Sequence, residues 1–163
     1  MTFRSRLALL VLMLGGVFAA GTATAGLLDG QAPALGDGVT STIVYRLGAV
    51  HFEPGGWVDT TVTCTNLSSA PATVGLEIFD ETDQKAGDLT KATVAAGGAV
   101  TFATSADAAP GAVAVAGLPP IDHGKARVSA STKQLTCTAV NRMRGSDGAV
   151  KEAPVELVKK VAF

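Results

Sequence analysis

Histidine, cysteine and aromatic side chains are scarce in this chain, and their scarcity excludes several functions. The 163 residues include two histidines, two cysteines and one tryptophan, and aromatic residues make up 5% of the total. Two histidines cannot supply a catalytic zinc site with three histidine ligands. The 13 basic and 14 acidic residues leave a net charge of -1, so the clustered basic excess of a nucleic-acid-binding protein is missing.

Sequence motifs for catalysis are missing as well. The chain has no G-x-S-x-G nucleophile elbow, no G-x-G-x-x-G turn and no phosphate-binding loop. The acidic residues 80–88 do not follow the order of an EF-hand calcium loop, and we interpret them as a solvated hairpin turn. His51 and His123 are interpreted as unrelated surface or edge histidines. The sequence therefore predicts no enzyme, no cofactor and no metal site.

The first 25 residues predict a signal peptide. Arg4 and Arg6 precede the uncharged segment 7–20, and small residues occupy the A-x-A positions at Ala23 and Ala25. This is the order of a secretory signal, although an anchor helix that stays attached is an alternative. The apolar segment is short for a membrane span. We expect cleavage after Ala25, export by the general secretory route to the periplasm or extracellular space, and no transmembrane span in the mature chain.

Short β-strands are expected after the signal peptide. Residues 26–41 are rich in Gly, Pro and Asp and predict a flexible lead-in. Residues 42–163 form the expected domain, because short β-rich runs alternate there with turn residues. The runs cover residues 42–46, 49–53, 57–66, 72–80, 90–94, 99–103, 112–116, 125–131, 134–142 and 155–163. This pattern predicts an all-β fold, a single immunoglobulin-like antiparallel β-sandwich of about seven to nine strands.

The two cysteines predict one disulfide bond. Cys64 and Cys137 each lie between threonines in an expected strand. Alternation along a strand then turns both cysteines inward and the threonines outward, and an exported protein favours an oxidised pair. An immunoglobulin domain has such a bond across its two sheets, but its characteristic Trp and Tyr are missing here. Whether this bond joins two sheets or two strands of one sheet is left open.

One part of the chain resembles a known type of protein. The stretches CTNLSSAPATVGLEIFDETDQKAG, VTFATS and GKARVSASTKQLTCTAV resemble a recurring type of small exported bacterial protein. In that type a "CTN" strand pairs with a "C-x-A" strand some seventy residues later, around a β-sandwich. The resemblance covers about residues 64–140 and implies export, a sandwich and a disulfide bond. It transfers no activity and no catalytic residue.

These observations predict an exported, non-catalytic structural or binding module for a protein or polysaccharide. The alternatives are a small exported enzyme with an unrecognised site and an envelope-associated protein. The corner formed by Glu53, Trp57 and Asp59 is the expected ligand contact, because an aromatic ring, carboxylates and a glycine turn meet there.

Overall fold

The computed structural model describes residues 30–36, 38–55 and 57–160. The expected signal peptide, residues 1–25, and the first residues of the lead-in lie outside this part. All regular secondary structure in the described part is β-strand. None of the described residues forms a helix long and apolar enough to cross a membrane.

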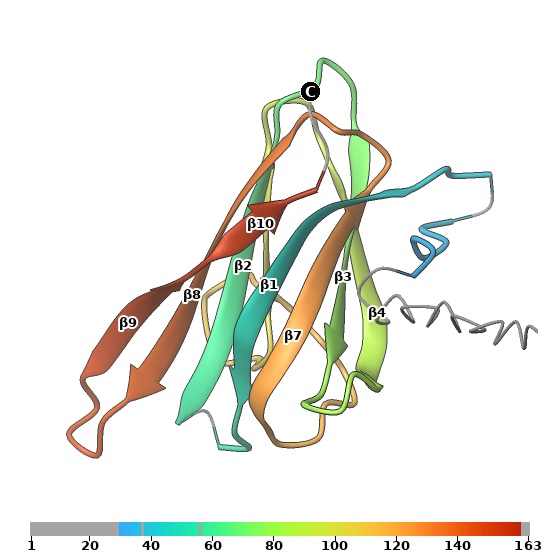
Figure 1. Ribbon diagram of the computed structural model, residues 1–163. Helices are drawn as coiled ribbons and strands as arrows, with labels where there is room; N and C mark the ends of the chain where they lie inside the picture. The colour runs from blue at the N-terminus through green and yellow to red at the C-terminus, as the bar shows by residue number, and fades with distance from the viewer. Residues whose placement is uncertain (1–29, 37, 56, 161–163) are drawn as a thin grey trace, which may run out of the picture.

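Ten strands make one sheet, which is nearly closed into a barrel (Figure 1). They are β1 (Thr42–Phe52), β2 (Val58–Asn66), β3 (Ala72–Phe79), β4 (Lys85–Val94), β5 (Ala99–Ala103), β6 (Val113–Ala114), β7 (Ile121–Ala130), β8 (Leu135–Arg144), β9 (Val150–Val155) and β10 (Leu157–Lys159). The all-β class is confirmed, but the expected count of seven to nine strands is wrong. The expectation of a purely antiparallel sheet is also wrong, because β5 and β6 pair in parallel.

The strands pair in two groups that meet at β1 and β2. One group runs β4-β3-β7-β1, with β10 on the other side of β1. The other contains β5, β2, β8 and β9 in that order. A single register pair, Phe52 with Asp59, joins β1 to β2, and the chain from β9 into β10 links the groups again (Figure 1).

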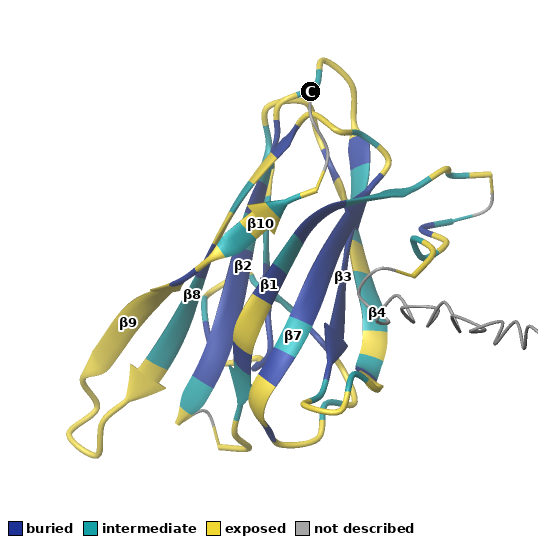
Figure 2. Ribbon diagram, viewed as in Figure 1, coloured by how far each residue is buried: buried dark blue, intermediate teal, exposed yellow. Residues whose placement is uncertain are grey.

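Alternating apolar residues on the inner face of the sheet form the core. Val74, Leu76 and Ile78 of β3 are each at most 1% exposed, as the alternation predicts. The same holds for the inward residues of β7, which are Ala126, Val128 and Ala130. Figure 2 shows that burial is concentrated in β2, β3 and β7, whereas β9 is almost entirely exposed.

The predicted disulfide bond between Cys64 and Cys137 is confirmed. The two residues are direct register partners in β2 and β8, and their Cα atoms lie 4.1 Å apart. The bond therefore joins neighbouring strands of one sheet. This differs from the immunoglobulin arrangement, in which the bond crosses from one sheet to the other.

Part of the lead-in packs against the outer face of the sheet. Leu35 is 3% exposed, although no strand contains it. A Cβ atom added to Gly75 of β3 would lie 2.5 Å from Cδ2 of Leu35. The absence of a side chain at Gly75 therefore makes room for Leu35.

This contact gives a prediction about stability. We expect Leu35→Ala to lower the free energy of unfolding by about 2 kcal/mol, near the low end for a buried leucine, because the lead-in can partly relax into the space. Leu67→Ala serves as the matched control, since Leu67 is 53% exposed and should change stability by less than about 0.5 kcal/mol. Urea unfolding followed by circular dichroism measures both values. Equal midpoints for the two variants would contradict the packing of Leu35.

Candidate functional site

Two β-bulges in the pairing of β1 with β7, the first in β1 and the second in β7, shape the candidate site. Leu47 pairs with Ala126 and Val50 pairs with Gly124, so two residues of β1 face one residue of β7. Phe52 then pairs with Ile121, so one residue of β1 faces two residues of β7. Bulges bend a strand and change the direction in which its side chains point.

One stretch of β1 lies between the residues that pair with β10 and the residue that pairs with β2. Backbone groups of this stretch form hydrogen bonds with side chains instead of a strand. The His51 N–H donates to Oγ1 of Thr60 at 2.8 Å, and Oγ1 of Thr104 donates to the His51 carbonyl at 3.0 Å. Nδ2 of Asn141 donates to the Ala49 carbonyl at 2.8 Å. Backbone groups in a sheet need such partners. The strand edge is therefore satisfied here without a neighbouring strand, and the sheet opens.

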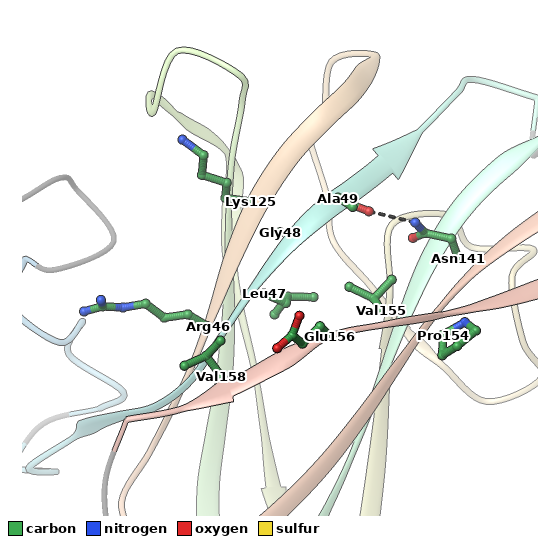
Figure 3. Close-up of a pocket in the computed structure, with 10 residues that line it drawn as sticks. All are labelled: Arg46, Leu47, Gly48, Ala49, Lys125, Asn141, Pro154, Val155, Glu156 and Val158. Carbon is green, nitrogen blue, oxygen red and sulfur yellow. Dashed lines mark hydrogen bonds between the residues drawn. The ribbon is translucent and has the colours of Figure 1, made fainter.

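Three hollows lie along this opening. The largest, of about 480 Å³, lies between the bulge at Gly48 and the chain that joins β9 to β10 (Figure 3). A second, of about 400 Å³, lies at the end of β1 and contains Glu53, Glu81 and Asp122. The third, of about 380 Å³, lies against the hairpin of β8 and β9.

The three hollows adjoin one another, because they share lining residues. Asn141 lines the first and the third. His51, Val58 and Asp122 line the second and the third. We call this surface of adjoining hollows the β1 groove. Figure 3 shows its first part, where Asn141 points from β8 to the Ala49 carbonyl.

The charges in the β1 groove differ between its ends. Arg46, Lys125 and the single carboxylate of Glu156 lie at one end, and in Figure 3 the two cationic side chains extend outward from β1 and β7. Lys125 also forms an ion pair of 2.6 Å with Asp83. Carboxylates gather at the other end, at Glu53, Glu81 and Asp122.

Three side chains, which we call the histidine cluster, meet where the second and third hollows join. They are His51 of β1 and Asp122 and His123 of β7, the residues that face one another across the second bulge. Nδ1 of His51 lies 3.6 Å from one carboxylate oxygen of Asp122, and Nδ1 of His123 lies 3.0 Å from the other. The ring centroids are 5.4 Å apart. The interpretation of the two histidines as unrelated is therefore wrong.

A carboxylate from another turn supports this cluster. Oε1 of Glu81, in the turn between β3 and β4, accepts the backbone N–H groups of Asp122 and His123 at 2.8 and 3.3 Å. These hydrogen bonds, the Asp122 contact first, lower the pKa of Glu81 below its usual value. Glu81 is thus held as an anion beside the cluster.

The structure separates the three residues expected to contact a ligand. Trp57 is 48% exposed, next to the glycine turn, and its carbonyl accepts the Arg144 N–H. Glu53 is exposed and lines the second hollow. Asp59 is 5% exposed and lies opposite Arg142 in the β2–β8 pairing. The prediction of a ligand contact at these residues stays untested.

Asp59 has an unusual electrostatic environment. Burial raises its pKa above the usual value, while the positive charges of Arg142 and Arg144 act in the opposite direction. One of its carboxylate oxygens is buried without a hydrogen-bond partner. Asp59 lines none of the three hollows.

No protein-family model, no curated protein and no solved structure matches this chain. The function must therefore be argued from the groove itself.

Proposed function

We propose that this protein is an exported, non-catalytic binding module that holds an extended segment of a partner protein in the β1 groove. The observation that carries the proposal is that three adjoining hollows lie along a strand edge whose backbone groups side chains have already satisfied. Such a groove suits an extended chain, whose own polar groups can meet the differing charges at its two ends.

The chemistry of the groove supports binding over catalysis. A carboxyl group that acts as a general acid near neutral pH needs a raised pKa and a substrate within reach. Asp59 is the described carboxyl whose pKa is raised, and it faces no hollow. This favours the binding module over the alternative of a small exported enzyme.

The proposed location rests on the sequence and on the disulfide bond. The signal-like first 25 residues and the bond between Cys64 and Cys137 both fit an oxidising compartment. We propose the periplasm or the extracellular space, reached by the general secretory route. The immunoglobulin-like sandwich also remains a proposal, supported by the two groups of paired strands.

A polysaccharide is the second candidate ligand, and Trp57 favours it. Its indole ring is half exposed beside the turn between β1 and β2, where a sugar ring could stack on it. The β1 groove itself has few aromatic side chains, with Phe52 the one Phe, Tyr or Trp among the residues that line its three hollows. A glycan is therefore expected at Trp57 and a polypeptide in the groove.

Blocking the groove tests the proposal. An added Cβ at Gly48 meets no atom within 4 Å, so Gly48→Leu should fold normally and place its side chain in the first hollow. Peptides selected from a displayed dodecapeptide library should bind the unmodified protein and lose at least about tenfold in affinity for Gly48→Leu, or about 1.4 kcal/mol. Ala99→Leu, at the exposed first position of β5, is the control.

The two ligand classes give different results in this experiment. Peptides that bind both variants equally well would place the interaction outside the groove. Quenching of Trp57 fluorescence by soluble peptidoglycan fragments, abolished in Trp57→Ala, would favour the polysaccharide instead.

A further inference from the structure

The histidine cluster results from the fold, because the second bulge, in which β7 has the extra residue, brings its members together. In a regular antiparallel pairing, each residue of one strand faces one residue of its neighbour. Here His51 faces both Asp122 and His123. The extra residue brings two imidazole rings and a carboxylate to one point on the surface.

The cluster places three side chains of metal-ligating types next to one another. The Asp122 carboxylate lies between the rings, with one oxygen toward Nδ1 of each. Two imidazoles that share a tetrahedral zinc have centroids about 5 Å apart, since each zinc–nitrogen bond is about 2.0–2.1 Å long. The observed 5.4 Å separation is close to this value.

We propose that the histidine cluster binds a divalent transition-metal cation such as Zn²⁺, with His51, Asp122 and His123 as its protein ligands. Two imidazole nitrogens and a carboxylate oxygen form a donor set that suits Zn²⁺, Ni²⁺ or Cu²⁺, whereas Mg²⁺ and Ca²⁺ prefer sites made of oxygen alone. The site lies within the β1 groove, where the second and third hollows join, but metal binding there does not depend on the proposed binding of a partner protein.

Metal binding requires a small rearrangement of exposed side chains. No three His, Cys, Asp or Glu side chains of the described residues are already arranged around one point as a metal site. The side chains of Asp122 and His123 are 82% and 74% exposed, so both can turn toward a cation. The His51 side chain is 21% exposed and supplies a more fixed donor.

The surrounding charges also bear on cation binding. Glu81 holds the backbone of Asp122 and His123 and adds a negative charge beside them, and Glu53 lines the same hollow. Two cations line the adjoining hollow, Lys151 and Arg142. Arg142 is paired with Glu152 at 3.3 Å, which partly offsets its charge.

Calorimetric titration of ZnCl₂ into the purified protein, prepared without a polyhistidine tag, tests the site. We expect one saturable site per chain. His51→Gln and His123→Gln should each weaken binding by at least about tenfold. Losing a direct metal ligand lowers the affinity more than losing a residue that only forms a hydrogen bond with a ligand. Asp122→Asn should also weaken it. Asp107→Asn, the control, changes an exposed carboxylate in the loop before β6. This variant should bind Zn²⁺ like the unmodified protein.

A second measurement distinguishes loss of the metal site from misfolding of a variant. Co²⁺ should give the visible absorption of a tetrahedral site in the unmodified protein and lose it in His123→Gln, whose side chain is too exposed for its loss to unfold the chain. Absence of saturable Zn²⁺ binding, or unchanged binding in both histidine variants, would overturn the proposal. The cluster would then be a surface ion pair only.

Discussion

Loss of the disulfide bond is expected to lower the free energy of unfolding by about 2–5 kcal/mol, the range usual for small secreted domains. The bond closes a loop of 73 residues between Cys64 and Cys137. Loop-closure entropy alone would make such a cross-link worth about 4 kcal/mol. Because Cys64 is completely buried in the core, its replacement also removes packing.

Two forms of the protein separate these contributions. Reduction of the unmodified protein breaks the cross-link but retains both sulfur atoms, whereas the double variant Cys64→Ala/Cys137→Ala loses both cross-link and volume. Urea unfolding should rank the oxidised protein first, the reduced protein second and the double variant last. Identical unfolding midpoints for the oxidised and reduced protein would show that the bond does not stabilise the fold.

The inner face of the sheet was predictable, because alternation in a strand directly specifies one buried side. Val74, Leu76 and Ile78 are buried as expected, and Cys64 shares the buried face of β2 with Val62. The disulfide bond followed from the same alternation. Whether it joined one sheet or two was not predictable, since alternation within a strand gives no information about which strands are neighbours.

The expected strand boundaries were wrong where the sequence pattern of a bulge resembles the end of a strand. Residues 42–46 and 49–53 were expected as two strands, but they belong to the single strand β1. Gly48 and Ala49 interrupt the alternation because they form the first bulge. In the opposite sense, most of β9 was missed because its residues are exposed and polar, and Pro154 is typical of an edge strand.

The histidine cluster could not be predicted for a related reason. His51 and His123 are 72 positions apart in the printed sequence, and their meeting depends on the β1–β7 register. The register is offset by one residue between Val50 and Phe52. No periodicity in either segment encodes that offset, so surface histidines were the natural interpretation.

The sequence did not predict a buried ion pair on the outer face of the sheet, and breaking this pair is expected to have a large effect on stability. Glu77 of β3 and Arg127 of β7 are register partners. Their side chains are 6% and 8% exposed, and Nε of Arg127 lies 2.6 Å from Oε2 of Glu77. In each strand the residue falls on the side opposite the core, where exposed charges are expected. Its burial depends on tertiary packing over that face.

Contacts around the pair show how it is accommodated. The Arg127 guanidinium lies 5.2 Å from the centroid of the buried Phe79 ring, an arrangement that favours a cation. Nζ of Lys85 lies 3.7 Å from the other oxygen of Glu77. Alternation also places Gly75, which accommodates Leu35, on the same face as Glu77.

Breaking this pair on one side should therefore be costly. Glu77→Ala is expected to lower the free energy of unfolding by about 3–5 kcal/mol, because it removes the carboxylate from a buried guanidinium. Lys125→Ala is a matched control in the same strand as Arg127, since its pair with Asp83 is partly exposed and should contribute at most about 1 kcal/mol. Urea unfolding measures both.

The double variant Glu77→Leu/Arg127→Met should be far more stable than Glu77→Ala. Removing both charges also removes the cost of taking them out of water, and buried pairs can often be replaced by apolar residues of similar volume with little loss. The full cycle, with each single variant, gives the coupling energy directly. If the double variant is as unstable as the sum of its single changes, the two side chains are not coupled, and the burial of Arg127 must depend on its other contacts, among them the one with Phe79. A double variant near the unmodified protein would instead show that the cost of each single change comes mainly from the charge left behind.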